Sequence, residues 1–543
     1  MFTPRHSLKA LVGSGITVTM LLGTGLAASP VHAAKATSTT TTSTTAAPTT
    51  TAPTTTTTTA KVTTTTAKAT TTTAAPVTST TAAATTTTRK SGKNTTTTAP
   101  SAKMAVAPTI APSTDVSAYA GDPGSMRRVN TMIGADTLWR QGFVGQGVDI
   151  AVIDTGVAQV PGLAGKVING PDLSLDSPYA PVLGVDAFGH GTHMAGIAAG
   201  LDAGTTDLFD PTKFVGVAPG SRIVNVKVGA FDGSVDVSQV IAAINWVVQH
   251  KNDSGLNIRV INLSFGTESL NNSWDDPLSW AAEVAARNGI VVVSSGGNDG
   301  ATVKVLSPAY NGFVLAVGSV DQTISPLSAS AFSNASGYTK PDVWAPGKSI
   351  LGLRVANSFL DARFPSARVG DRLFKGSGTS QASAVVSGAA ALLASAHPGA
   401  TAMQIRTALK MSGESVTGEI TSFINVAKAD QLLTYGKIQH IELPFIGTPG
   451  RGSLEATRGA SARLVFNGVP LTGERDIFGR AWNAETMAVS TQKLTSWTGG
   501  SFNGNSWAGN SWAGASWAGA SWAGNSWAGN SWAGSGWKGV VWG

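Results

Sequence analysis

Four short stretches of the chain contain polar residues of the types that nucleophilic catalysis requires. Ser380 lies in the stretch 375–388, where small residues precede an apolar run, so we expect this serine at the start of a buried helix. The N–H groups and the dipole at a helix N-terminus favour negative charge on a substrate oxygen. A serine becomes a nucleophile only where a base can take its proton. The chemistry of Ser380 therefore depends on the other three stretches.

Two histidines, His190 and His193, lie three residues apart near the predicted start of a small, apolar helix. Such a pair could belong to a metal site. However, no Glu lies between them as in the H-E-x-x-H motif and no acidic cluster follows, so the pattern disfavours zinc. We interpret His190 as an imidazole base and His193 as a buried residue that supports it, and we predict no metal site.

Asp154 and Asn298 each follow a short apolar run. Asp154 ends the run 148–153, and Asn298 lies in a glycine-rich turn after the run 290–293. Taken alone, Asp154 could be a loop-capping residue, and Asn298 could be present for its backbone conformation. Their alternative uses are an orienting carboxylate and an amide donor to an oxyanion. Such a donor contributes about a hundred- to a thousand-fold in turnover.

The elements that would position these residues alternate along the chain. Strand-like apolar runs and segments with helical spacing follow one another, which predicts an α/β fold with a mostly parallel sheet and helices on both faces. In such sheets, functional sites form beyond the carboxyl ends of the strands. The predicted strands are 148–153, 221–228, 259–264, 290–294 and 313–320, and the predicted helices are 133–140, 237–249, 277–288 and 382–396.

The four motifs occur in one order, as IDTG at Asp154, HGTH at His190, SGGN at Asn298 and GTSQAS at Ser380. With them, the chain resembles the subtilisin-like serine proteases (subtilases, peptidase family S8) over roughly 117–433. In this family the catalytic triad runs Asp, His, Ser along the sequence. The resemblance implies a three-layer sandwich, and it extends to further family segments at 216–219, 260–266 and 341–347.

The resemblance also implies a role for each matching residue. Ser380 would attack the peptide carbonyl, His190 would take and return its proton, and Asp154 would orient the imidazolium. The Asn298 side chain and the Ser380 N–H would hold the oxyanion. The substrate would add as a strand between two protein edges and place one side chain in a pocket. The residues implied for substrate binding are Ser234, Val235, Asp236, Ser264, Phe265, Gly266, Gly296 and Gly297.

The sequence departs from the family pattern in several places. Gln381 replaces the Met that usually follows the serine, and Ala384 replaces a Pro in the same helix; neither change removes a group that the chemistry uses. Gly162 stands where many relatives have a calcium-binding Asp, so that calcium site is expected to be absent, while a structural calcium elsewhere stays open. The chemistry itself requires no cofactor. A folded inhibitory pro-domain is not evident before the catalytic domain.

Composition and flanking segments define the predicted domain organisation. The chain has 543 residues, no cysteine and a net charge of +7 without a basic stripe, so disulfides and thiolate chemistry are excluded and nucleic-acid binding is disfavoured. We predict a signal peptide at 1–33, with an uncleaved membrane anchor as the alternative. A Thr/Ala/Pro-rich disordered spacer at 34–116 and the catalytic domain at 117–435 follow.

A connector at 436–496 and a repetitive tail at 497–543 complete the chain. We have no sequence-based role for the connector segments 450–456 and 473–479. The tail repeats an aromatic residue, mostly Trp, every five positions. It could bind a cell-wall glycan or a surface partner through exposed tryptophans, or be an adhesive tail without a specific ligand.

The sequence therefore predicts a secreted or cell-surface serine endopeptidase that acts on polypeptides. Two alternatives stay open: a surface-binding protein with a weakly active subtilase scaffold, and a protease dedicated to processing one partner.

Overall fold

The computed structural model describes part of the chain. The described residues are 115–177, 182–253, 255–336, 340–438, 449–459, 464–466, 469–477, 480–497, 501–502, 505–506 and 541–542. The predicted signal peptide, all of the predicted spacer except 115–116, and most of the predicted tail lie outside them.

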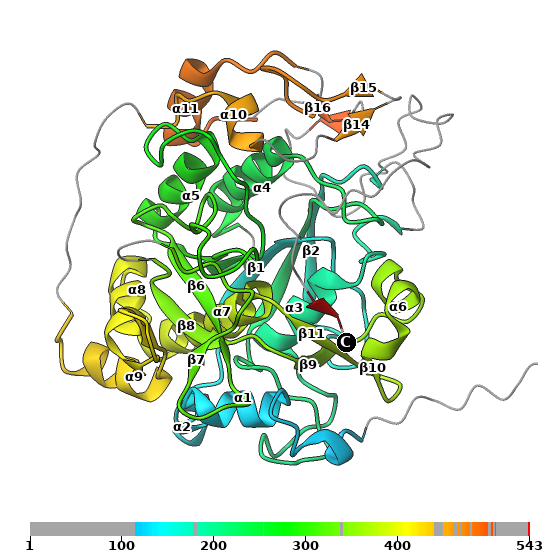
Figure 1. Ribbon diagram of the computed structural model, residues 1–543, viewed down its shortest axis with the longest axis vertical. Coiled ribbons are helices and arrows are strands. Elements are labelled where there is room, and N and C mark those ends of the chain that lie inside the picture. The colour runs from blue at the N-terminus through cyan, green and yellow to red at the C-terminus, as the bar shows by residue number, and fades with distance from the viewer. Residues whose placement is uncertain are drawn as a thin grey trace, which may run out of the picture. The chain divides into compact units, whose positions relative to one another are not determined.

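A ten-stranded sheet organises the described residues (Figure 1). Its strands run in the order β12-β13-β8-β6-β5-β4-β1-β3-β2, and β7 pairs with β6. Pairing is parallel from β2 across to β13, and only β12 and β7 are antiparallel to their neighbours. The predicted α/β fold with a mostly parallel sheet is confirmed. The strands are β1 (Asp149–Asp154), β2 (Val167–Asp172), β3 (Arg222–Lys227), β4 (Ile258–Leu263), β5 (Val291–Ser295), β6 (Leu315–Asp321), β7 (Ser328–Ala329), β8 (Val343–Pro346), β12 (Glu414–Ser415) and β13 (Ser422–Phe423).

Helices cover both faces of this sheet. They are α1 (Met126–Met132), α2 (Ala135–Arg140), α3 (His190–Ala199), α4 (Val237–His250), α5 (Pro277–Arg287), α6 (Phe359–Arg363), α7 (Thr379–Ala396), α8 (Ala402–Met411), α9 (Val426–Thr434), α10 (Leu454–Arg458) and α11 (Ala484–Gln492). Short 3-10 turns lie at Ser117–Tyr119 and Pro365–Ala367.

Successive side chains of a strand point to opposite faces, and β1 shows how this divides the core in two. Ile150 and Val152 pack in the larger core together with α3 and α7. Ala151 and Ile153 pack in a second core with α4 and α5. The continuous apolar run at 148–153 therefore reflects a strand that is buried on both faces, as expected for a parallel sheet between two helical layers.

Helix α7 is buried along nearly its whole length, because its sequence is small and apolar on every side. Gly388 lets this helix approach its neighbours closely. A Cβ atom at Gly388 would lie 2.5 Å from the Val217 Cβ and 2.8 Å from the Ala198 carbonyl oxygen at the end of α3. The packing of α3 against α7 therefore depends on the absence of a side chain here.

A smaller sheet leads into α7. In it β11 (Leu373–Ser377) pairs with β9 (Ile350–Leu353) and β10 (Arg368–Val369), and its last two residues pair with β18 (Val541–Trp542). Two-stranded pairs also form between β14 (Val465–Phe466) and β15 (Val469–Pro470) and between β16 (Ser501–Phe502) and β17 (Asn505–Ser506).

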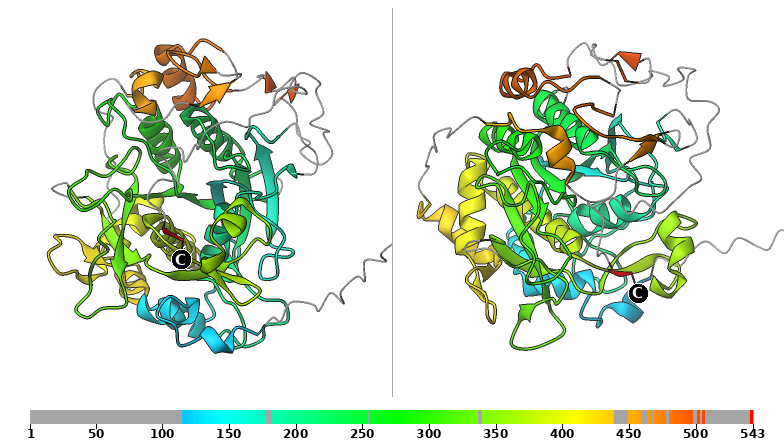
Figure 2. Two further views of the ribbon diagram at one scale, coloured as in Figure 1. Left: turned by 45° about the vertical axis from the view of Figure 1, so that its right-hand side comes forward. Right: turned by 45° about the horizontal axis from the view of Figure 1, so that its top comes forward.

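The described part of the predicted connector packs on the helical layer formed by α4 and α5, where it is drawn in orange (Figure 2). Leu454 and Trp482 are buried in the same core as those helices. The Trp280 Nε1 of α5 donates a hydrogen bond to the Ala488 carbonyl of α11 at 3.0 Å. The domain boundary at 435 stays a prediction, but the chain beyond it contributes to the second core.

Most of the predicted elements agree with the structure to within a few residues. The predicted helix 133–140 corresponds to α2, which begins two residues later, at Ala135, after the N-cap residue Gly134 with φ +72°. The predicted helix 382–396 begins earlier, at Thr379, so that Ser380 lies within its first turn.

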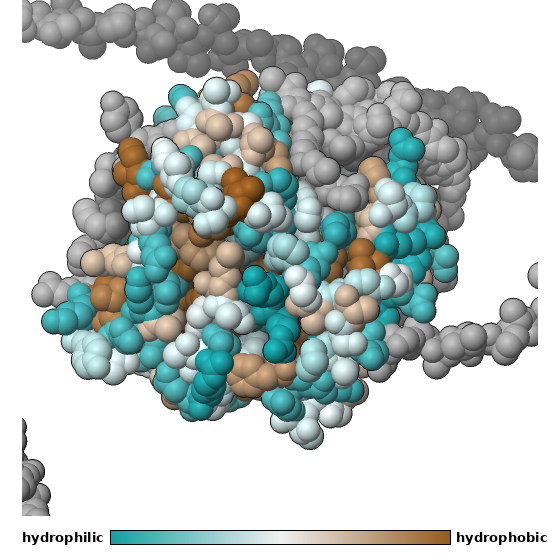
Figure 3. All heavy atoms as spheres, turned by 60° about the horizontal axis from the view of Figure 1, so that its bottom comes forward, coloured by the Kyte–Doolittle hydropathy of each residue, from teal (hydrophilic) through white to brown (hydrophobic). Residues whose placement is uncertain are grey.

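No described helix is long and apolar enough to cross a membrane. On the face shown in Figure 3, hydrophilic and hydrophobic side chains are intermixed.

The close approach at Gly388 predicts a stability defect. Gly388→Ala should lower the free energy of unfolding by about 1–2 kcal/mol, because overpacking against Val217 and the Ala198 carbonyl exceeds the gain in helix propensity. Urea unfolding measures the change. Gly399→Ala is the matched control, since a Cβ there meets nothing within 4 Å. Equal stability of the two variants would contradict this account of the packing.

Burial of His193 in α3 predicts loss of stability in acid. Burial, with a smaller contribution from the charge of His190, lowers the pKa of His193 to about 3. The unfolded chain binds this proton at about pH 6.5, whereas the folded chain does not. The stabilising contribution is complete above pH 6.5 and is lost as the pH falls from there toward 3. In urea unfolding at several pH values, His193→Gln should show a shallower decline over this range; an unchanged slope would refute the assignment.

Candidate active site

Asp154 is the last residue of β1, and its side chain is fully buried. Its Oδ1 contacts the His190 Nδ1 at 2.8 Å and accepts a hydrogen bond from the Thr155 N–H at 2.8 Å. Burial raises the pKa of the Asp154 carboxyl, while the charge of His190 and its hydrogen bond oppose that rise. The contact fixes the His190 ring and directs its Nε2 away from the carboxylate, where it can exchange a proton.

His190 is the first residue of α3, and the glycine after it explains how the helix can start against β1. A Cβ at Gly191 would lie 2.1 Å from the Gly156 carbonyl oxygen and 3.1 Å from the Asp154 Cβ. Any side chain at Gly191 would therefore push the first turn of α3 away from the carboxylate. In the HGTH motif, the glycine at position 191 is therefore required for packing.

Asp186 supports this arrangement, although it was not among the residues predicted for the site. Its Oδ1 accepts hydrogen bonds from the Thr155 hydroxyl at 2.8 Å and from the Gly189 N–H at 2.6 Å. Its Oδ2 accepts from the Thr192 N–H at 2.7 Å. One buried carboxylate thus ties the loop after β1 to the first turn of α3. An acidic residue four positions before the histidine was the available signal.

Ser380 is the second residue of α7, which packs against α3. The Ser264 hydroxyl donates to the Ser380 carbonyl at 3.3 Å, which brings the end of β4 to the serine. The Ser380 hydroxyl is buried and forms no hydrogen bond with another described residue. Catalytic hydrogen bonds are often long before substrate binds and tighten afterwards.

Asn298 lies in the turn after β5, and its side chain contacts the first residue of α7. Its Oδ1 accepts hydrogen bonds from the Thr379 N–H at 2.8 Å and from the Thr379 hydroxyl at 3.0 Å. Because the oxygen of the amide faces Thr379, the NH2 end is the group presented as a donor. The contact to Thr379 therefore determines which end of the Asn298 amide is available as a donor.

The residues predicted to bind substrate lie around this centre. Two of the three groups follow parallel strands directly: 264–266 after β4 and 296–297 after β5. The third, 234–236, lies between β3 and α4. Since the carboxyl ends of parallel strands meet at one edge of the sheet, all three groups border the site.

A cavity of about 630 Å³ opens beside Thr267, the residue that follows the group 264–266. Leu306, one of its lining residues, packs closely against Gly266 and Gly297, because a Cβ at either glycine would come within 3.0 Å of the Leu306 side chain. The residues that line it are Thr267, Glu268, Ser269, Asn271, Asn272, Ser273, Val303, Lys304, Val305, Leu306, Ser307, Tyr310, Ser336 and Lys340.

Two family departures are buried in the core. Ala384 packs among apolar neighbours, and the Gln381 amide is buried without a hydrogen bond to a described residue. Nothing in the structure explains why Gln stands at this position.

The surroundings of Gly162 do not fit the calcium site for which many relatives have an Asp at this position. Its neighbour Asp202 forms a buried ion pair with Arg372, which contacts both carboxylate oxygens and also donates to the Pro161 carbonyl at 3.3 Å. A guanidinium thus already neutralises the nearest carboxylate. Within the described ranges, no group of three or more His, Cys, Asp or Glu side chains is arranged to hold a metal ion.

Known proteins resemble the central part of this chain. Serine protease AprX of Bacillus subtilis (strain 168) is 34% identical over 284 residues, which are 50% of this chain and 62% of the relative. The thermophilic serine proteinase of Bacillus sp. (strain AK1) is 36% identical over 289 residues, 53% of this chain and 62% of the relative. The chain thus spans less than two thirds of the length of these two proteins.

Subtilisin DY of Bacillus licheniformis is covered almost completely. It is 32% identical over 306 residues, which are 55% of this chain and 97% of the relative. The model of the subtilase family matches residues 145–435, more than half of the chain. This chain therefore belongs to the subtilase family.

Proposed function

We propose that this protein is a serine endopeptidase that hydrolyses peptide bonds through an acyl-enzyme on Ser380. The observation that carries the proposal is the buried 2.8 Å contact between Asp154 and His190 at the start of α3, the helix that packs against the helix of Ser380. Membership of the subtilase family supports it, as do the relatives named serine proteases.

In the proposed mechanism, the Ser380 hydroxyl attacks the peptide carbonyl and its proton passes to the His190 Nε2. Asp154 stabilises the imidazolium through Nδ1. The tetrahedral oxyanion is held by the Asn298 NH2 group and by the Ser380 N–H at the start of α7. His190 then protonates the leaving amine, and water repeats the sequence to release the acyl group.

The proposed substrates are polypeptides in extended form. A strand laid between 234–236 and 264–266 would be recognised by main-chain hydrogen bonds, which accept many side chains. One side chain of the substrate would enter the cavity that Leu306 helps to line.

We propose an extracellular or cell-surface location on the basis of the N-terminal export pattern. A cell-wall glycan or surface partner for the Trp-rich tail stays a prediction, as does the alternative of a protease dedicated to one partner. A surface-binding protein with a weakly active scaffold is the second class of function, and the labelling experiment below separates it from a protease.

A fluorophosphonate probe tests the nucleophile. The purified protein should be labelled on Ser380, and Ser380→Ala should abolish labelling and lower peptide hydrolysis by about four orders of magnitude or more. Mass spectrometry of the labelled peptide locates the site. Ser383→Ala, one helical turn along α7, is the control that should keep the label. A folded wild-type protein without label would refute the protease function.

Steady-state kinetics test the oxyanion donor. Asn298→Ala should lower kcat about a hundred- to a thousand-fold with little change in KM, because the donor acts on charge that develops only in the transition state. Thr379→Val, which removes a hydroxyl that orients the amide, should lower kcat by a smaller factor. A large rise in KM at unchanged kcat for Asn298→Ala would instead indicate a role in ground-state binding.

A further inference from the structure

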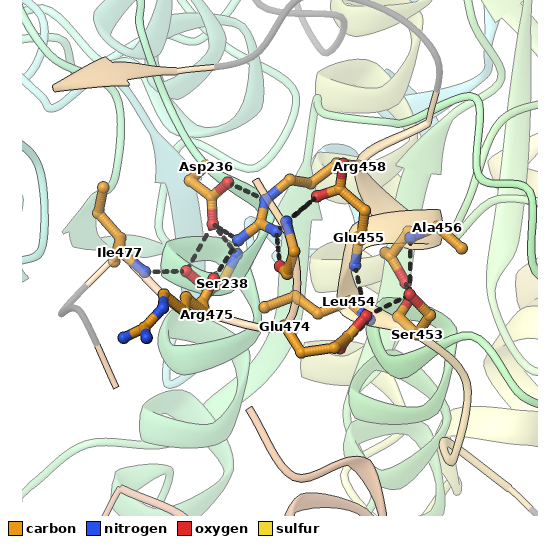
Figure 4. Close-up of polar contacts among 12 residues, drawn as sticks. Asp236, Ser238, Ser453, Leu454, Glu455, Ala456, Arg458, Glu474, Arg475 and Ile477 are labelled. Carbon is orange, nitrogen blue, oxygen red and sulfur yellow. Dashed lines mark hydrogen bonds and ion pairs between the residues drawn. The ribbon is translucent and has the colours of Figure 1, made fainter. Parts of the chain in front are cut away.

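The described residues of the predicted connector contact two places. One is residues 234–238, which we call the rim of the candidate site, and the other is the second core. We name residues 449–459 and 471–477 the C-terminal brace; 471–477 includes the described part of the segment 473–479, for which the sequence suggested no role. The brace contains α10 and lies beside α4 and α5 in both views of Figure 2. Figure 4 shows the polar contacts that connect it to Asp236 and Ser238.

Asp236 has two structural tasks. It is the third residue of the predicted substrate edge 234–236, and it caps α4 by accepting hydrogen bonds from the Ser238 N–H at 3.0 Å and the Ser238 hydroxyl at 2.6 Å. The Gln239 side chain completes a capping box by accepting from the Asp236 N–H. Any group that holds the Asp236 carboxylate therefore fixes the end of this edge.

Arg458, the last residue of α10, holds that carboxylate. Its Nε donates to the Asp236 Oδ2 at 2.7 Å, and the two side chains are almost completely buried. The remaining donors of the guanidinium bind Glu455 at 3.1 Å, the Gly473 carbonyl at 2.8 Å and the Arg475 carbonyl. The planar fork of an arginine suits such a set of fixed acceptors, which a lysine could not satisfy.

A further contact connects the brace to the same helix start. The Ile477 N–H donates to the Ser238 hydroxyl at 2.9 Å. Within the brace, Glu474 accepts hydrogen bonds from the Ser453 hydroxyl and from the Leu454 N–H, so the first turn of α10 is joined to the segment 471–477. The rim at 234–238 is thus held by two parts of the brace that also hold each other.

Helix α10 also contacts the chain that follows the second substrate edge. The chain beyond 264–266 runs into 268–271, where the Leu270 N–H donates to the Ala456 carbonyl at 2.9 Å. The Asn271 Nδ2 donates to the Ser453 carbonyl at 2.8 Å and to the Thr457 hydroxyl at 2.9 Å. One short helix is therefore bonded to the extensions of both edges between which the substrate would lie.

From these contacts we propose that the C-terminal brace sets the separation of the two substrate edges, and that Arg458 is a positioning residue for binding of extended peptides. The inference rests on the proposed protease function, and it assigns a role to a part of the chain beyond the residues that the family model matches. A buried ion pair adds little to stability compared with an apolar pair, but it defines one geometry. Here that geometry is the distance between two edges that must both contact one strand.

The test compares substrates of different length on the full-length protein. A tetrapeptide p-nitroanilide engages both edges, whereas an acyl-amino-acid p-nitrophenyl ester engages mainly the pocket and the nucleophile. Arg458→Gln should raise KM for the tetrapeptide about tenfold, as expected for the loss of one or two main-chain hydrogen bonds. The ester reaction and the rate of fluorophosphonate labelling of Ser380 should change by less than about twofold.

Arg451→Gln is the matched control. Arg451 is in the same brace and pairs with Glu485 at 2.9 Å, but both side chains are exposed. The control removes the same charge and should leave both reactions unchanged. A folded Arg458→Gln protein with the length preference of the wild type would overturn the proposal.

Arg458→Gln leaves the buried Asp236 carboxylate without its charged partner, so a milder variant keeps the test decisive if Arg458→Gln does not fold. Arg458→Lys retains the positive charge but loses the forked contacts, and it should show an intermediate rise in KM for the tetrapeptide alone. An unchanged KM for folded Arg458→Lys in that case would overturn the proposal.

Hydrogen exchange separates the brace from the protease function. In Arg458→Gln or Arg458→Lys, the backbone amides of 238–239 and of Leu270 should exchange faster than in the wild type and in Arg451→Gln. Unchanged exchange at both edges would overturn the proposal even in an active enzyme. Conversely, faster exchange in a protein that neither labels nor cleaves would support the brace and refute the proposed protease function.

Discussion

The close approach of α3 to the end of β1 is the constraint on which the candidate site depends. The Asp154 carboxylate and the His190 ring can meet at 2.8 Å only because the next residue, Gly191, has no side chain to collide with the backbone at Gly156. A parallel sheet brings the carboxyl ends of its strands to one edge, and helices that start there present their first turns to it. The architecture therefore brings together the groups that we propose for catalysis.

Placing charged and polar groups in this buried edge requires partners for them. Desolvation raises the pKa of the Asp154 carboxyl, and the imidazole and N–H donors around it offset part of that effect. Asp186 shows the same principle without a chemical role, since backbone and hydroxyl donors surround both its oxygens. Burial of this kind holds the side chains in one arrangement, which is what electrostatic stabilisation of a transition state requires.

The second core extends this organisation beyond the segment that resembles other subtilases. Leu454 and Trp482 pack around α4 and α5 in this core. Arg458, which follows Leu454 in α10, contacts Asp236 at the rim of the candidate site. In this chain the helical layer opposite α7 is therefore built from helices that lie between the four sequence motifs and from residues that follow the last motif. A segment that contributes no catalytic group can still decide how the groups that contact a substrate are spaced.

By itself the sequence determined the fold class and indicated the residues that we propose for catalysis, because both have local signatures. Buried parallel strands appear as apolar runs such as 148–153, and the motifs around Asp154, His190, Asn298 and Ser380 each occupy a few adjacent residues. Only the tertiary structure decided the support given by Asp186 and the ion pair of Arg458 with Asp236. That pair joins positions 222 residues apart in the sequence. Such contacts depend on how elements pack, and neither composition nor periodicity encodes them locally.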